Sequence, residues 1–153
     1  MRLTFTKRSG KYDDLAIERR DGPPESIRCP KQGIIPHDMV HFAVESTLAR
    51  RGFLSLVADG EAAGFTAGGG DAEESVERLV ECLQAEMWGG RVSAEDLLAT
   101  YELACAARGH PAAPVSAADV ENIRARLDDL SARWEALPLN ASLTVELDAK
   151  GPE

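Results

Sequence analysis

Apolar and polar residues alternate along the first thirty positions, and this alternation predicts β-strands. It occurs in residues 2–8, 13–22 and 25–30, with turn-forming Gly, Pro, Ser and Asp residues between them. A period of two places every second side chain on one buried face of a sheet. The same pattern returns in residues 141–148, which predicts a fourth strand in the same sheet. The inward positions would be Leu3, Phe5, Leu15, Ile17, Ile27, Cys29, Leu143, Val145 and Leu147.

The centre of the chain has the three- and four-residue spacing of apolar positions that is typical of amphipathic helices. Helix starts are predicted at Pro36, at Asp71 as an N-cap with Glu74 completing a capping box, and at Ser93 and Ser116. The corresponding helix ends are Gly52, Gly89–Gly90, Gly109 and Pro138. Residues 53–60 favour a further short helix, and the Gly- and Ala-rich residues 61–70 predict a flexible loop.

The strands are segregated from the helices, which predicts an α+β fold. We expect an antiparallel sheet of about four strands, three N-terminal and one C-terminal, with four or five helices packed on one face. Because the last strand would pair with the first ones, residues 1–153 should form a single domain. The apolar positions of the last helix, Val120 to Leu137, form a seam that could pack within the chain or across a dimer.

Charge narrows the classes of partner. The chain has 153 residues, 17 Lys and Arg against 26 Asp and Glu, and a formal net charge of −9. Binding to nucleic acid needs a basic face, so the charge argues against it, and it also disfavours anionic membrane surfaces. No apolar run approaches the roughly 20 residues of a membrane span, and the N-terminal residues lack a signal-peptide core. We therefore expect a cytoplasmic protein without nucleic-acid or membrane partners.

The three cysteines carry no recognisable motif. Cys29, Cys82 and Cys105 are far apart and do not form a C-x-x-C pair. We expect them to be reduced packing residues, because a free thiol in an apolar pattern behaves as a small hydrophobic group.

The clearest chemical feature is the segment GIIPHDMVHFAVE at residues 33–45. His37 and His41 are four apart on a predicted helix, so their imidazoles project in similar directions and could bind one ion. Glu45 lies a further turn along and Asp38 lies beside them. Imidazole and carboxylate ligands suit zinc, iron or manganese. Alternatively, the two histidines could serve the fold alone, with His41 donating a hydrogen bond to a carbonyl or carboxylate group.

HDMVH also resembles the H-E-x-x-H helix of the zincin metallopeptidases, although aspartate replaces glutamate. The resemblance covers five residues and implies that His37 and His41 bind zinc while Asp38 acts as the general base. Aspartate is one methylene shorter than glutamate, so its reach to a metal-bound water is reduced. A third ligand would be needed, and the residues leave four candidates open: Cys29, Glu61, Glu81 and Glu86.

Over the whole chain, the segments GIIPHDMVHFAVE, AEMWGG and RWEALP…SLTVEL resemble features of uncharacterised bacterial proteins of unknown function. That resemblance implies no activity. The sequence contains no complete catalytic constellation, which favours a non-enzymatic binding or interaction module, with a protein partner or a second copy of the chain. The alternative is a divalent-metal-binding protein that uses His37 and His41, with Glu45 or Asp38 assisting, and that could be a metal-dependent hydrolase.

Overall fold

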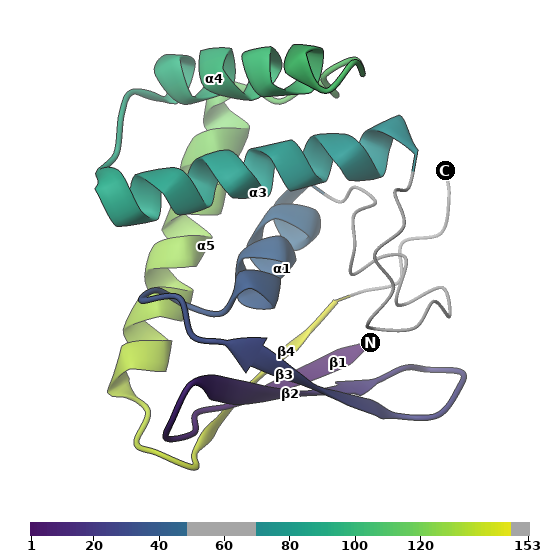
Figure 1. Cartoon of the computed structure of the whole chain (residues 1–153), viewed down its shortest axis with the longest axis vertical. Helices are drawn as coiled ribbons and strands as arrows, with labels where there is room; N and C mark the ends of the chain where they lie inside the picture. The colour runs from purple at the N-terminus through teal and green to yellow at the C-terminus, as the bar shows by residue number, and fades with distance from the viewer. Residues whose placement is uncertain (49–69, 148–153) are drawn as a thin grey trace.

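The computed structural model describes residues 1–48 and 70–147. In these residues, three strands come first, four helices follow, and one strand closes the order. Figure 1 shows the helices gathered on one face of the sheet, as the α+β prediction requires. The predicted short helix at 53–60 and almost all of the predicted loop at 61–70 lie outside the described residues.

The sheet is antiparallel and has the order β3-β2-β1-β4. Its strands are β1 (Arg2–Thr6), β2 (Tyr12–Glu18), β3 (Glu25–Pro30) and β4 (Ser142–Glu146). The register pairs Phe5 with Leu15 on one side and with Leu143 on the other, so apolar side chains line up across three strands. These side chains are buried, and together they form the floor of the core.

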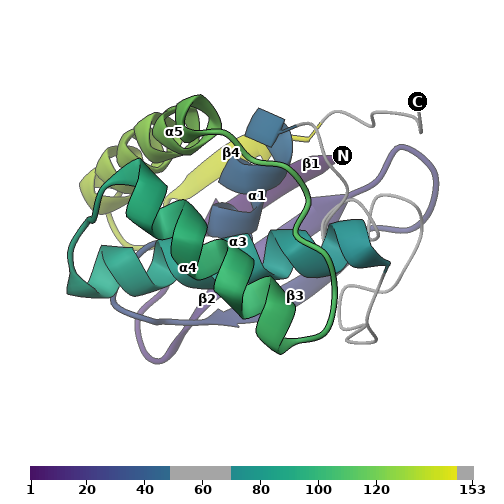
Figure 2. The same ribbon diagram turned by 90° about the horizontal axis from the view of Figure 1, so that it is seen from above.

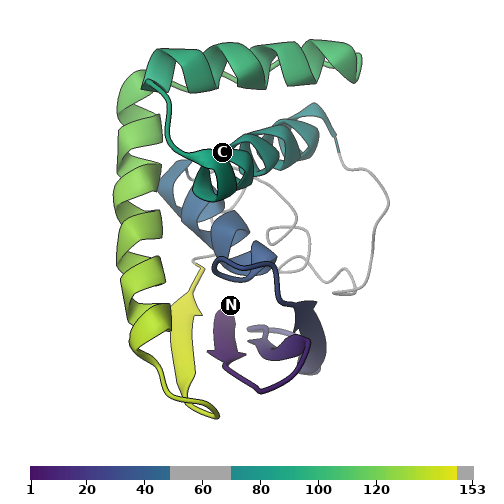
Figure 3. The same ribbon diagram turned by 60° about the vertical axis from the view of Figure 1, so that its left-hand side comes forward.

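The helices begin at α1 (His37–Leu48), which is followed by α3 (Asp71–Gly89), α4 (Ala94–Ala107) and α5 (Ala117–Ala136). Figure 1 shows α1 directly above the sheet, α3 above α1, and α4 outermost. The view from above in Figure 2 agrees with this order of layers. In Figure 3, α5 runs along one side of α1 and leads through a short turn into β4.

Two of the predicted N-caps, Ser93 and Ser116, are confirmed. The Ser93 side chain accepts a hydrogen bond from the Asp96 backbone N–H, and Ser116 forms a complete capping box with Asp119. The prediction that Asp71 caps its helix was wrong. Gly70 occupies the N-cap, no side chain caps it, and Asp71 is the first helical residue, where its charge still favours the positive end of the helix dipole.

The apolar seam of α5 packs within the chain. Val120, Ile123, Leu127, Leu130 and Trp134 are all buried, and α5 contacts both α1 and α4. Among the described residues, no helix is long and apolar enough to cross a membrane.

Candidate functional site: a histidine–carboxylate cluster between α1 and α3

Helix α1 is buried on nearly all sides, and this explains the environment of its polar residues. The sheet lies below it, α3 covers it and α5 flanks it, so every residue from Met39 to Glu45 is buried. His41 is 0% exposed and Glu45 is 1% exposed. Buried polar groups require partners, so the side chains around these two residues determine what the site can do.

Three side chains meet between α1 and α3. His37 and His41 come from successive turns of α1, and Glu77 comes from the facing surface of α3. Each offers one ligand atom, and these atoms all lie within 4.8 Å of one another. Nε2 of His41 lies 3.1 Å from Oε1 of Glu77. The two imidazole rings stand edge to face, with centroids 4.7 Å apart.

The opposite nitrogen of each imidazole has its own partner. Nδ1 of His41 lies 3.1 Å from Oε2 of Glu45, one turn further along α1. Nδ1 of His37 lies 2.9 Å from Oε1 of Gln84 on α3. In both histidines Nδ1 therefore faces a hydrogen-bonding side chain, and Nε2 is the nitrogen left for a metal ion. Metal-binding histidines are commonly held by an acceptor on the other ring nitrogen in this way.

The surroundings shift the pKa values of the cluster strongly. Burial by itself would lower the pKa of His41, but hydrogen bonds with Glu45 and Glu77 outweigh burial and raise this pKa to about 10. Burial tends to raise the pKa of Glu77, yet its hydrogen bond with His41 and the charges of both histidines lower it overall. Without a metal ion, His41 is therefore an imidazolium held between two carboxylates.

Asp38 belongs to the same electrostatic neighbourhood. Burial raises the pKa of its carboxyl group, the two histidines oppose that shift, and Glu77 and Glu45 add to it. The Cys29 thiol donates a hydrogen bond to Oδ2 of Asp38 over 3.9 Å. The predicted base therefore lies beside the cluster, and its catalytic role stays a prediction.

The structure places Glu45 behind His41 rather than at the meeting point of the three ligand atoms. Its contact is with Nδ1, while Glu77 faces Nε2. The sequence-based expectation that Glu45 binds the metal directly stays a prediction, but Glu77 is the carboxylate that converges with both imidazoles.

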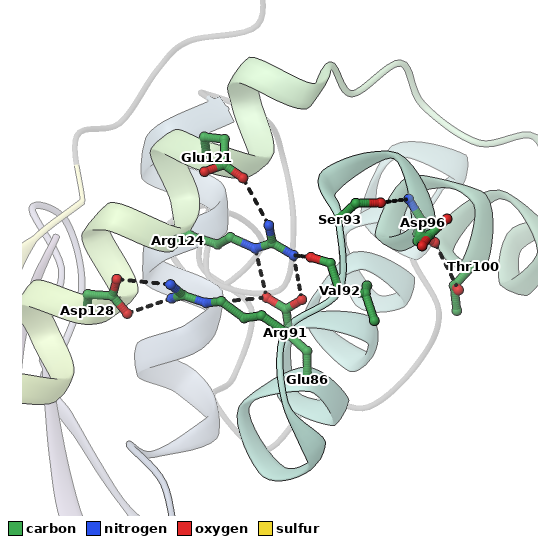
Figure 4. A network of polar contacts seen from close by, with 9 residues as sticks. All are labelled: Glu86, Arg91, Val92, Ser93, Asp96, Thr100, Glu121, Arg124 and Asp128. Atoms are coloured by element: carbon green, nitrogen blue, oxygen red, sulfur yellow. Dashed lines mark hydrogen bonds and ion pairs between the residues drawn. The ribbon is translucent and has the colours of Figure 1, made fainter.

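Of the four candidates for a third ligand, the three in the described residues contact other partners. Glu81 forms an ion pair with Arg78 on its own helix at 2.9 Å, and Glu86 pairs with Arg124 of α5 at 2.6 Å (Figure 4). Cys29 donates to Asp38, and Glu61 lies outside the described residues.

The sequence reasoning missed both Glu77 and Gln84. The two residues are seven positions apart, which is close to two turns, so they share one face of α3. Both border the buried stripe that includes Val76, Val80 and Leu83. Two polar residues at this spacing beside an apolar stripe are a usable signal, but they identify a site only when the face opposite them is known.

Comparison of the chain with protein-family models, with curated proteins and with solved structures gives no match. The site must therefore be interpreted from its own geometry and chemistry.

Proposed function

We propose that this protein binds a divalent transition-metal ion between α1 and α3, with His37, His41 and Glu77 as ligands. The convergence of the three ligand atoms within 4.8 Å carries the proposal. Tetrahedral zinc with bonds of about 2.0–2.2 Å places its ligand atoms about 3.3 Å apart. His41 and Glu77 already meet that separation at 3.1 Å, and the widest pair would need to close by only about 1.5 Å.

The donor set supports zinc or iron(II) over calcium or magnesium. Two imidazole nitrogens and one carboxylate are typical of zinc and non-haem iron sites, whereas calcium and magnesium prefer oxygen ligands alone. In this proposal Glu45 holds His41 in place rather than binding the ion. The ion would replace the proton on Nε2 of His41. The carboxylates of Glu45 and Glu77 would then compensate the positive charge of the ion.

Direct binding measurements test the proposal. Untagged protein is stripped with a chelator, dialysed and titrated with Zn²⁺, Fe²⁺ or Mn²⁺, with binding followed by calorimetry and by elemental analysis. We expect about one ion per chain for at least one of these metals. At 100 times the dissociation constant, stabilisation of about 2.7 kcal/mol should raise the melting temperature by about 5–10 °C.

Matched variants locate the bound ion. His37→Ala and Glu77→Gln should weaken binding strongly, whereas His110→Ala and Glu81→Gln should not. His110 is the third histidine and lies in the segment between α4 and α5, and Glu81 is one turn beyond Glu77 on the same helix. No binding by the wild type, or equal binding by wild type and Glu77→Gln, would reject this site.

A metal-dependent hydrolase is the second candidate function, and Asp38 is the observation that favours it. Three protein ligands leave a coordination position for water or substrate, as in catalytic zinc sites. Asp38 would accept a proton from the attacking water, and its raised pKa suits that role. Asp38→Asn should then abolish hydrolysis of ester or phosphate-ester substrates while one ion remains bound. Metal binding without such activity would leave the non-enzymatic binding module as the function.

We propose a cytoplasmic protein whose partners are other proteins or a second copy of the chain, and not nucleic acid. The chain has 26 acidic and 17 basic residues, and this negative balance supports the absence of a nucleic-acid partner. Sedimentation of the purified protein with and without the ion tests self-association.

A further inference from the structure

An imidazole binds a metal ion only through a nitrogen that carries no proton, so the tautomer of each histidine decides which nitrogen is available. Metal-free His41 carries a proton on both nitrogens, because Nδ1 faces the Glu45 carboxylate and Nε2 faces the Glu77 carboxylate. A metal ion would displace the proton on Nε2, and Nδ1 would keep the proton that it donates to Glu45. For His37 the partner is an amide, which has one accepting end and one donating end. The orientation of the Gln84 amide therefore fixes the tautomer of His37.

A backbone carbonyl sets the orientation of that amide. The carbonyl oxygen of Ile35 can only accept, and it lies 2.9 Å from the side-chain nitrogen of Gln32. The same nitrogen has a second hydrogen, which it donates to Oε1 of Gln84 at 3.0 Å. Since the end of the Gln84 amide that meets Gln32 must be its oxygen, the oxygen also faces Nδ1 of His37 at 2.9 Å. Nδ1 must therefore be the donor.

The chain of hydrogen bonds is well anchored. Gln84 is only 7% exposed, so its amide depends on protein partners. Gln32 lies between β3 and α1, and its backbone carbonyl accepts a 2.7 Å hydrogen bond from the indole N–H of Trp88 near the end of α3. Two contacts thus tie this segment to α3, which also carries Glu77. The partner of His37 and the carboxylate ligand are held on one rigid helix.

We propose that Gln84, oriented by Gln32, is a positioning residue that keeps the proton of His37 on Nδ1 and presents Nε2 to the ion. Glu45 would keep the proton of His41 on Nδ1 when an ion displaces the proton on Nε2, so both imidazoles would bind the ion through Nε2. The position of the His37 proton is a property of the metal-free protein and does not depend on metal binding. The part that concerns the ion rests on the proposed function. The two histidines differ in the charge of their partners, because one faces a neutral amide and the other a carboxylate.

The tautomer is tested on the metal-free protein. Long-range ¹H–¹⁵N NMR at pH 8 distinguishes protonated from unprotonated imidazole nitrogens, and the His37→Ala spectrum assigns the signals. We expect a protonated Nδ1 and an unprotonated Nε2 in His37. Gln84→Ala should produce a mixture of tautomers, and Gln84→Glu, which keeps an accepting oxygen, should restore the wild-type pattern. A proton on Nε2 in the wild type would overturn the proposal whether or not the protein binds metal.

Metal affinity tests the second part, with Zn²⁺ as the probe and a chromophoric chelator as the competitor. Loss of such a hydrogen-bond partner weakens metal binding by about 10–100-fold, which is the effect expected for Gln84→Ala. Gln84→Glu should recover affinity to within a few-fold, and Glu81→Ala on the same helix should leave it unchanged. Wild-type affinity in Gln84→Ala would overturn the positioning role. Absence of binding in every protein would instead reject the metal site, while the NMR result would still decide the tautomer.

Discussion

Nε2 of His41 on α1 lies 3.1 Å from Oε1 of Glu77 on α3, and this contact joins the two helices above the sheet. The imidazole is fully buried, whereas the Glu77 side chain is 33% exposed. On its other side His41 meets Glu45 at the same distance. A single buried ring is thus shared by two carboxylates on two helices, and removing it changes both the charge balance and the packing of the layer.

Replacement of His41 by alanine should destabilise the metal-free protein by about 3–5 kcal/mol, because it removes the imidazolium from a buried ion pair with the Glu45 carboxylate. Urea unfolding in the presence of a chelator measures this loss. The double variant His41→Ala/Glu45→Gln should recover part of the stability, since a neutral amide costs less to bury. A loss below about 1 kcal/mol in the single variant would contradict the proposed charge pairing.

The metal-free protein should lose stability at high pH through His41. The folded-state pKa of about 10 lies above the unfolded value of 6.5, so the stabilisation is complete below about pH 6.5 and disappears as pH rises through 10. The pKa of Glu77 is lowered on folding from its ordinary value of 4.5. Its contribution to the free energy of unfolding is therefore present above pH 4.5 and is lost as the pH falls through the folded-state pKa. Unfolding free energies of wild type and His41→Gln between pH 5 and 10.5 test this. A constant difference between the two proteins over that range would contradict it.

The pair of Glu86 and Arg124 should be a major link between α3 and α5. Figure 4 shows the Arg124 guanidinium holding the carboxylate of Glu86 with two hydrogen bonds, at 2.9 and 2.6 Å. Both side chains are at least 93% buried. Arg124→Ala should therefore cost about 3–5 kcal/mol in chemical unfolding. The matched control is Arg133→Ala, whose exposed ion pair with Asp129 should contribute less than about 1 kcal/mol.

Cys29 should react slowly with thiol reagents. Burial and the nearby charge of Asp38 raise the pKa of its thiol to about 12, so little thiolate exists at pH 8. Alkylation with iodoacetamide, followed by mass spectrometry of peptides, should label the more accessible Cys82 first. Asp38→Asn should speed the labelling of Cys29. Labelling of Cys29 ahead of Cys82 in the wild type would contradict this electrostatic description.

The sheet and most of the helix limits in the described residues could be predicted because they depend on local patterns. Alternation marks the strands, and Ser93 and Ser116 mark two helix starts by hydrogen bonds within four residues. The Asp71 prediction failed at this same local level. Asp71, Glu73 and Glu74 all interact favourably with the helix dipole, and an acidic residue one position inside the helix looks the same in sequence as an N-cap.

The candidate site was only half predictable. The spacing of His37 and His41 is a property of one helix, so the sequence shows it directly. Glu77 joins the site because α3 packs on α1. The periodicity within each helix does not show which face of α3 contacts which face of α1. The burial of α1 on nearly all sides was missed for the same reason. The apolar stripe predicted for it gives the direction of one buried face, not the number of elements that cover the helix.

The pairing of β1 with β4 has a consequence for synthesis on the ribosome. β1 lies between β2 and β4, and backbone hydrogen bonds of 2.9 Å between Met1 and Leu147 close the end of the pair. While the nascent chain is being made, all the described helices emerge before β4 does, and one edge of β1 lacks its neighbour throughout. Unpaired strand edges template aggregation. Translation that stops before Ser142 should therefore yield an aggregating product, whereas a chain that includes β4 covers this edge of β1.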